Sequence, residues 1–215
     1  MNRVKTILLL LPVLLSGCGF NAAYKPAANY YYLNPNKDLS AIGRTALVEL
    51  GNDSAFPQIS ADVTEALYQA LQKKQVFGLT VIRQNDPVWR KLQLQLDLNS
   101  AYTLEQLSAM RKTLNCDAVL IGTVTVFEPF PHLIIGLRLK LRDLTDGEVL
   151  WALEQIWDTT DKTTQERVKN YYKHCILPGF ETLQEKLGIV SSLRFLKFVA
   201  FETSETLQPK RKWLK

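Results

Sequence analysis

The side chains that carry most enzyme and metal chemistry are scarce in this chain of 215 residues. It has two histidines, His132 and His174, and three cysteines, Cys18, Cys116 and Cys175. A nucleophile needs a neighbouring base, but His132 stands in the proline-bounded stretch EPFPH, where an exposed loop is expected. His174 and Cys175 are adjacent in a predicted helix, so their side chains diverge by about 100° and do not share one metal or substrate atom. We therefore predict no enzyme, no metal site and no cofactor.

Acidic residues gather in one region, at Asp143, Asp146, Glu148, Asp158 and Asp161. Asp146 precedes a glycine in a predicted hairpin turn, and Asp158 and Asp161 stand where a strand passes into a helix. Aspartates are favoured at both kinds of position because their side chains bond the nearby backbone. These conformational roles account for the cluster without a metal or a pair of catalytic carboxylates.

The N-terminus has the pattern of a signal peptide. Arg3 and Lys5 precede an apolar run at residues 7–15, and small residues follow it. A membrane-spanning helix needs about 20 apolar residues, and this run is shorter and is broken by Pro12. We predict that residues 1–17 are a signal peptide.

The four residues Leu15-Ser16-Gly17-Cys18 resemble the lipobox of bacterial lipoproteins. That resemblance implies that the Cys18 sulfur receives a diacylglycerol, becomes the mature N-terminus and carries acyl chains such as palmitate. Each buried CH₂ contributes about 0.8 kcal/mol, so three chains would hold the protein stably in a membrane. Gly19 follows the cysteine, where an aspartate would resemble an inner-membrane retention signal. We therefore predict a lipid anchor in the outer membrane, facing the periplasm.

In an oxidising compartment Cys116 and Cys175 could form one disulfide, or remain buried thiols among their apolar neighbours. The formal charge of +5 is concentrated at the C-terminus, in the tail at 208–215 with Lys210, Arg211, Lys212 and Lys215. We read this tail as a solvated end, with contact to anionic lipid as the alternative. Its charge does not indicate a nucleic-acid-binding face.

The hydrophobic pattern after residue 40 predicts alternating strands and helices. Strands are expected at 44–50, 79–83 and 117–127, the last interrupted by Gly122, and helices at about 59–74 and after a capping box formed by Thr103 and Gln106. From Leu133 to Leu141 every second residue is apolar, which predicts a strand with one wet face. The dipeptide Asp146-Gly147 predicts a hairpin turn.

A returning strand is expected at 148–158, with Trp151 and Trp157 in the core, and then a helix opened by a second capping box at Thr163 and Glu166. The order β-α-β-α-β-β-β followed by helices predicts an α/β (α+β) fold, a mixed sheet covered by helices. We predict a single domain over 41–207. Residues 18–40 are interpreted as the lipidated N-terminus and a partly ordered linker. The alternative is that Tyr30, Tyr31 and Tyr32 dock on the domain or on a partner.

The C-terminal segment at 193–201 is apolar around most of a helix. Its rings Phe195, Phe198 and Phe201 form a candidate partner-docking site, with burial between the sheet and neighbouring helices as the alternative.

Four phrases, ALVELGN, SADVTEALYQALQKKQVFGLTVIR, LNCDAVLIGTVTVFEP and LRLKLRDLTDGEVLWA, resemble a domain shared by bacterial envelope lipoproteins. This α/β periplasmic domain occurs in the curli-secretion channel subunit, the lipoprotein activator of penicillin-binding proteins, flagellar lipoprotein relatives and, more remotely, the Tol-system propeller protein. The likeness covers about 44–158 and implies the fold. Overall the sequence most resembles lipoproteins of the envelope that have no established role.

The resemblance leaves two functions open. The curli-type subunit builds its pore from long membrane-crossing hairpins, whereas EPFPH is short and the residues after Trp157 are polar. We therefore expect a lipid-anchored, non-enzymatic protein-interaction module that docks on or helps assemble an envelope complex, with an unknown protein partner. The alternative is an oligomeric ring or secretion-channel component built from copies of this chain.

Overall fold

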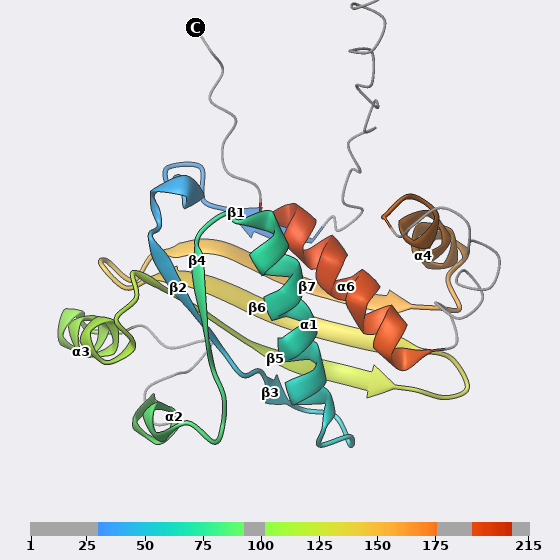
Figure 1. Cartoon of the computed structure of the whole chain (residues 1–215), viewed down its shortest axis with the longest axis horizontal. Coiled ribbons are helices and arrows are strands. Elements are labelled where there is room, and N and C mark those ends of the chain that lie inside the picture. The colour runs from blue at the N-terminus through green and yellow to red at the C-terminus, as the bar shows by residue number, and fades with distance from the viewer. Residues whose placement is uncertain (1–29, 93–101, 176–190, 208–215) are drawn as a thin grey trace, which may run out of the picture.

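The alternating stretch predicted at 133–141 forms most of a strand, Ile134–Asp143, in the middle of a mixed β-sheet (Figure 1). The computed structural model describes residues 30–92, 102–175 and 191–207, and within these ranges the sheet has seven strands. They are β1 (Tyr31–Leu33), β2 (Arg44–Val48), β3 (Gly51–Asn52), β4 (Gly78–Ile82), β5 (Ala118–Glu128), β6 (Ile134–Asp143) and β7 (Val149–Asp158). Their order is β1-β7-β6-β5-β2-β4, with β3 also beside β5. β2 pairs in parallel with β4 and with β5, and β3 pairs in parallel with β5. The pairs β5–β6, β6–β7 and β7–β1 are antiparallel.

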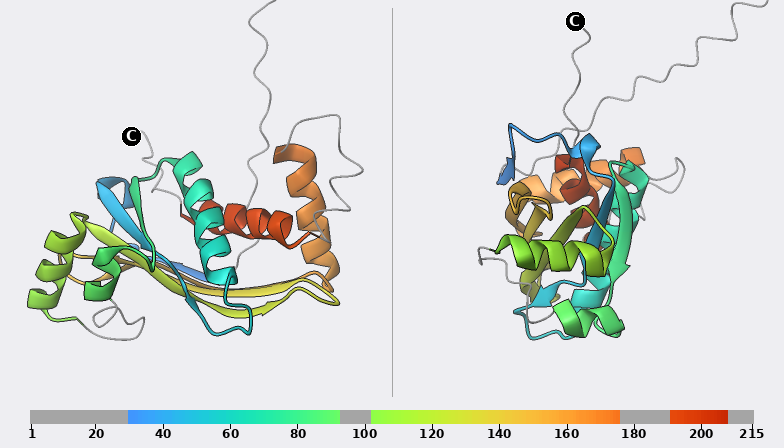
Figure 2. Two further views of the ribbon diagram at one scale, coloured as in Figure 1. Left: turned by 60° about the horizontal axis from the view of Figure 1, so that its bottom comes forward. Right: turned by 90° about the vertical axis from the view of Figure 1, so that its left-hand side faces the viewer.

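The helices cover the sheet unequally. The described helices are η2 (Leu39–Ala41, a 3-10 turn), α1 (Ile59–Lys74), α2 (Pro87–Leu92), α3 (Leu104–Leu114), α4 (Lys162–Cys175) and α6 (Ser192–Thr206). Both α1 and α6 lie across one face, whereas α2 and α3 lie at one end of the molecule and α4 at the other (Figures 1 and 2). None of the helices in the described ranges is long and apolar enough to cross a membrane. The mixed α/β fold expected from the sequence is confirmed.

The main core lies between the sheet and the pair α1 and α6. Ile135, Leu137, Leu139 and Leu141 are fully buried there, which confirms the period of two expected for this strand. A smaller core fills the other face near β2, where α3 buries its apolar stripe, including Met110, against the sheet. Removal of these side chains from water supplies most of the stabilisation of both layers.

Of three predicted caps and turns, the cap of α3 and the β6–β7 turn form as predicted, and the cap of α4 differs. Thr103 and Gln106 form the expected capping box of α3, and Gly147 takes the left-handed conformation (φ +78°) that the β6–β7 turn requires. The capping box expected at Thr163 and Glu166 is wrong. Asp161 instead accepts hydrogen bonds from the backbone N–H groups of Thr163 and of Thr164, at 3.2 and 2.9 Å, because a carboxylate at the N-cap can satisfy two of the free donors of the first turn.

Residues 30–40, predicted as part of a linker, are incorporated into the domain. β1 is an edge strand beside β7, and the side chain of Asn34 donates a 3.1 Å hydrogen bond to the backbone oxygen of Val149. Lys37 bonds to Asp143 at 3.0 Å and to Asp146, and these bonds raise the pKa of its ammonium group. The described domain therefore includes residues 30–40. The strand β5 also differs from expectation, because it continues through Gly122.

A buried polar network joins α6 to the sheet and to α4. The indole N–H of Trp157 donates to Oε2 of Glu202 at 2.7 Å, and Arg167 of α4 pairs with the same oxygen at 3.2 Å. The indole N–H of Trp151 donates to Oγ1 of Thr206 at 3.1 Å. Both tryptophans are fully buried, as predicted. These bonds fix the register of α6 on β7, because each buried donor would otherwise be unsatisfied.

Candidate functional site

Exposed side chains gather on the sheet face turned away from α1 and α6. Direct cross-strand partners share a face of an antiparallel sheet, so the register brings Arg138 beside Glu154, and Ala152 beside Tyr32. Among the described elements, α2 and α3 lie below one end of the sheet and leave the rest of this side without a helix (Figure 2, left). We call it the open face; its members are Tyr30, Tyr32, Arg138, Lys140, Ala152, Glu154 and Ile156.

The open face is aromatic and apolar as well as charged. The exposed fractions are 74% for Tyr30, 48% for Tyr32 and 62% for Ile156. A shallow hollow of about 520 Å³ lies against Tyr30, Tyr32, Arg138 and Glu154. Single exposed apolar residues are common on soluble proteins, but several on adjoining strands mark a surface suited to binding.

An ion pair crosses the open face. The guanidinium of Arg138 donates to Oε1 of Glu154 through Nη2 at 2.7 Å and Nε at 3.1 Å. The bond from Arg138 lowers the pKa of the Glu154 carboxyl, so the pair is charged at neutral pH. Both partners are largely solvent-exposed and can exchange this contact for one with another molecule.

A second apolar surface lies where the β5–β6 hairpin approaches the start of α6. Phe130, Leu193 and Phe56 are exposed by 85%, 58% and 41%. Phe56 packs edge-on against Phe127 with ring centroids 5.4 Å apart. Next to this pair is a cavity of about 280 Å³, which Leu193 also lines.

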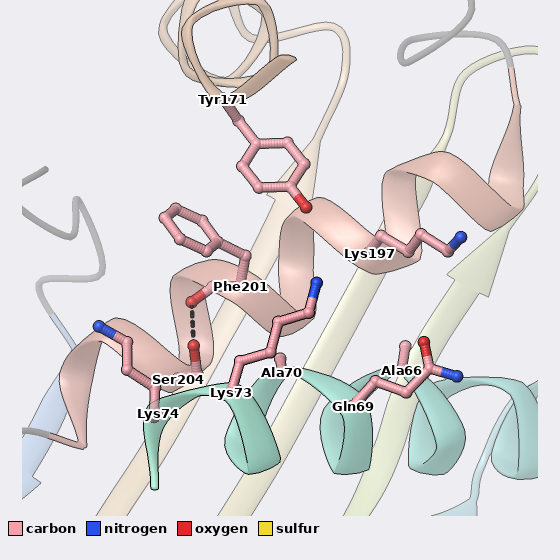
Figure 3. A pocket seen from close by; sticks show the side chains of 9 residues that line it. All are labelled: Ala66, Gln69, Ala70, Lys73, Lys74, Tyr171, Lys197, Phe201 and Ser204. Atoms are coloured by element: carbon pink, nitrogen blue, oxygen red, sulfur yellow. Dashed lines mark hydrogen bonds between the residues drawn. The ribbon is translucent and has the colours of Figure 1, made fainter. Parts of the chain in front are cut away.

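A hollow of about 340 Å³ lies between α1 and α6 and is bordered by Tyr171 of α4 (Figure 3). Three of its nine lining residues are lysines and none is acidic. From α1 and α6 it is lined by Ala66, Gln69, Ala70, Lys73, Lys74, Lys197, Phe201 and Ser204. We call it the lysine groove.

Several solved structures are similar to part of this chain at low sequence identity. PelC from Paraburkholderia phytofirmans, a dodecamer, is 15% identical with a TM-score of 0.41, over 60% of this chain and 78% of PelC. The lipoprotein GNA1162 from Neisseria meningitidis is 16% identical (TM-score 0.38, 53% of this chain and 78% of that one). The C-terminal domain of LpoB from Salmonella enterica is 21% identical (TM-score 0.36, 54% and 82%).

Neither a protein-family model nor a curated protein matches the sequence. A shared fold does not carry activity or partners from one protein to another, so the function has to come from the surfaces of this chain.

The structure corrects the docking site predicted on α6. Phe195 and Phe198 are fully buried, because α6 packs along the sheet beside α1 and turns these rings into the core. Phe201 is half-buried in the lysine groove, with its ring centroid 4.8 Å from that of Tyr171. The alternative, a core helix, is the one that the structure adopts.

Of the two alternatives for Cys116, a disulfide with Cys175 or a buried thiol, the structure has the second: Cys116 is a buried free thiol. Burial raises the pKa of this thiol, which keeps it protonated and unreactive. Cys116 stands two residues after the end of α3, and Cys175 is the last residue of α4, which lies at the other end of the sheet (Figure 1). The side chain of Cys175 lies outside the described residues.

Some of the remaining residues considered in the sequence lie in the described parts of the chain, and others lie outside them. His132 is exposed in its loop, and Asp143, Asp146 and Asp161 hold Lys37 and the first turn of α4 as described above. No group of three or more potential metal ligands occurs within the described ranges. Cys18 and the tail at 208–215 lie outside those ranges, as does the side chain of His174.

Sequence reasoning missed the open face because its members come from three strands whose order the sequence does not state. The exposed tyrosines were visible as a run at 30–32. What made them a site is the pairing of β1 with β7, a contact between residues more than a hundred positions apart.

Proposed function

We propose that this chain is a non-enzymatic protein-interaction module of the bacterial envelope, which docks a protein partner on the open face. The observation that supports this proposal is the exposure of Tyr30, Tyr32 and Ile156 around the Arg138–Glu154 ion pair on the sheet. Tyrosine and arginine are enriched in protein interfaces because each combines a large contact area with a directed polar group.

The chemistry of the open face favours a protein over a small molecule. Its hollow is shallow and spreads over three strands, whereas sites for small ligands are concave and bury most of the ligand. A partner that covers Tyr32 and Ile156 would remove apolar area from water and could make polar contacts with the Arg138–Glu154 pair between them.

We further propose that the module is held at the periplasmic side of the outer membrane by lipid on Cys18. Support comes from the lipobox resemblance and from Gly19 after the cysteine. The twelve residues from 18 to 29 extend to about 40 Å at most, so the domain stays close to the membrane surface. Fatty-acid labelling of the parent chain and of Cys18→Ala tests the anchor; equal labelling of both contradicts it.

Site-specific photocrosslinking in intact cells tests the docking surface. A photoreactive amino acid is placed at Tyr32 or at Ile156, with matched exposed positions on α1 (Gln72) and α3 (Lys112) as controls. We expect crosslinks to one heterologous envelope protein from the two open-face positions and not from the controls.

Two results would overturn the assignment. Equal crosslinking from all four positions would mean that the open face has no special role. Crosslinks from Tyr32 and Ile156 only to other copies of the chain would instead favour the ring or secretion-channel component.

A further inference from the structure

We propose that the lysine groove binds the phosphate-bearing headgroup of an anionic phospholipid. This inference goes beyond the docking of a protein partner and concerns the opposite side of the sheet. It uses the proposed anchor at Cys18 only to orient the domain, and its test needs no anchor.

The groove offers positive charge without a matching acid. The ammonium of Lys74 is paired with Glu205. Lys73 and Lys197 are exposed, and within the described ranges neither has an ion-pair partner. Because no acidic residue lines the hollow, these two ammonium groups are available to a bound anion.

The groove also has an apolar side. The ring of Phe201 and the short side chains of Ala66 and Ala70 lie beside the lysines, and Lys73 and Tyr171 extend toward the same space from opposite sides (Figure 3). A volume of about 340 Å³ is within the range of about 300–1,000 Å³ usual for small-ligand sites. An apolar strip beside cations suits a molecule whose phosphate adjoins a glycerol and acyl chains better than it suits free phosphate.

The position of the groove favours a membrane over an acidic peptide. Leu33 of β1 lies opposite Trp151, whose indole bonds to Thr206 near the end of α6. Lys74, at the end of α1, is tied to Glu205 in the same turn of α6. The described domain therefore begins and ends beside the lysine groove (Figure 1).

The sequence beyond this edge is also suited to a lipid surface. Residue 30 is twelve residues from Cys18, and the basic tail at 208–215 follows the end of α6 directly. A domain anchored at Cys18 would thus have its attachment point, its basic tail and the lysine groove at one edge.

Vesicle sedimentation tests the proposal with the chain from residue 18 onward, carrying Cys18→Ser so that no acyl group is present. Vesicles contain phosphatidylcholine alone or with phosphatidylglycerol. The variant Lys73→Gln/Lys197→Gln is compared with Lys91→Gln/Lys112→Gln, which removes two exposed lysines from α2 and α3 at the far end of the sheet. All proteins keep the basic tail, so its contribution cancels.

We expect binding to vesicles with phosphatidylglycerol and little binding to phosphatidylcholine alone. Each lysine near an anionic surface contributes about fivefold in affinity, so the groove variant should lose about 25-fold, and the control pair much less. Equal losses in both variants, or no binding by the parent chain, would overturn the proposal.

Two competitors separate the other sources of negative charge. Release from the vesicles by millimolar inorganic phosphate would assign the groove to a soluble phosphate compound. Release by an acidic peptide at a concentration where phosphate has no effect would assign it to a protein segment. Either result contradicts the lipid headgroup, and neither bears on the open face.

Discussion

Two glutamates that each pair with an arginine allow a direct test of how α6 is held. The Glu202 side chain is fully buried, where it accepts from the Trp157 indole and pairs with Arg167. Glu154 pairs with Arg138 on the open face, with 66% of its side chain exposed. Replacing either glutamate by leucine removes the same functional group from opposite environments.

The Glu202→Leu variant should lose about 3–5 kcal/mol in the free energy of unfolding, because removal of one partner leaves a largely buried arginine charge unpaired and the Trp157 indole N–H without an acceptor. A chain of this size changes its Tm by about 2–4 °C per kcal/mol, so the loss corresponds to about 6–20 °C. Glu154→Leu should leave the Tm nearly unchanged, since exposed ion pairs contribute little.

Urea unfolding followed by tryptophan fluorescence and by circular dichroism measures both variants, and the double variant Arg167→Met/Glu202→Leu adds a check. Removing both charges should recover part of the loss, because no buried charge is then left unpaired. If Glu202→Leu is no more destabilising than Glu154→Leu, or if the double variant is no more stable than Glu202→Leu, the buried network does not hold α6 in place.

Three further outcomes are expected. Leu137→Asp should cost about 3 kcal/mol or more in urea unfolding by placing a carboxylate in the core, whereas Arg138→Asp should be mild; equal effects would place the register of β6 in doubt. Asp161→Ala should lower the Tm and Glu166→Ala should not, and the reverse order would restore the capping box predicted from sequence. Bonds from Arg111 and the backbone lower the pKa of Asp117 below 3.8 in the fold, so its contribution is present above that pH and lost as the pH falls through the lowered value. Asp117→Asn should therefore lose less stability than the parent chain between pH 5 and 2, as urea midpoints would show, and parallel pH profiles would contradict this.

The sequence was sufficient where a signal is local and unopposed. The alternation from Leu133 to Leu141 and the capping box of Thr103 and Gln106 each depend on residues within one element, and both are confirmed. At the start of α4 two signals compete. Asp161, two residues before Thr163, offers a carboxylate that accepts backbone bonds more strongly than a hydroxyl, and a pattern search for a capping box passes over it.

The sequence was insufficient where the outcome depends on what lies across the sheet. The apolar rings of α6 could face a partner or the core, and only the position of α1 beside them fills the rest of the layer and buries Phe195 and Phe198. The three-residue strand β1 is too short to show a period, so its pairing with β7 follows from the bonds of Asn34 and Lys37 rather than from any pattern within it.

The attachment of residues 30–41 to the sheet has a mechanical consequence for an anchored protein. If the domain is anchored at Cys18 as proposed, a pull from the membrane would act first on β1. This strand is held to β7 by a short ladder and by Asn34, and the segment after it is held by the ion pairs of Lys37. Release of this segment adds twelve residues to the chain between anchor and domain, or about 40 Å when extended. The working distance from the membrane would then rise from about 40 to about 80 Å at full extension. Under the proposed anchoring, the pairing of this edge strand with β7 would therefore set how far from the membrane the domain reaches.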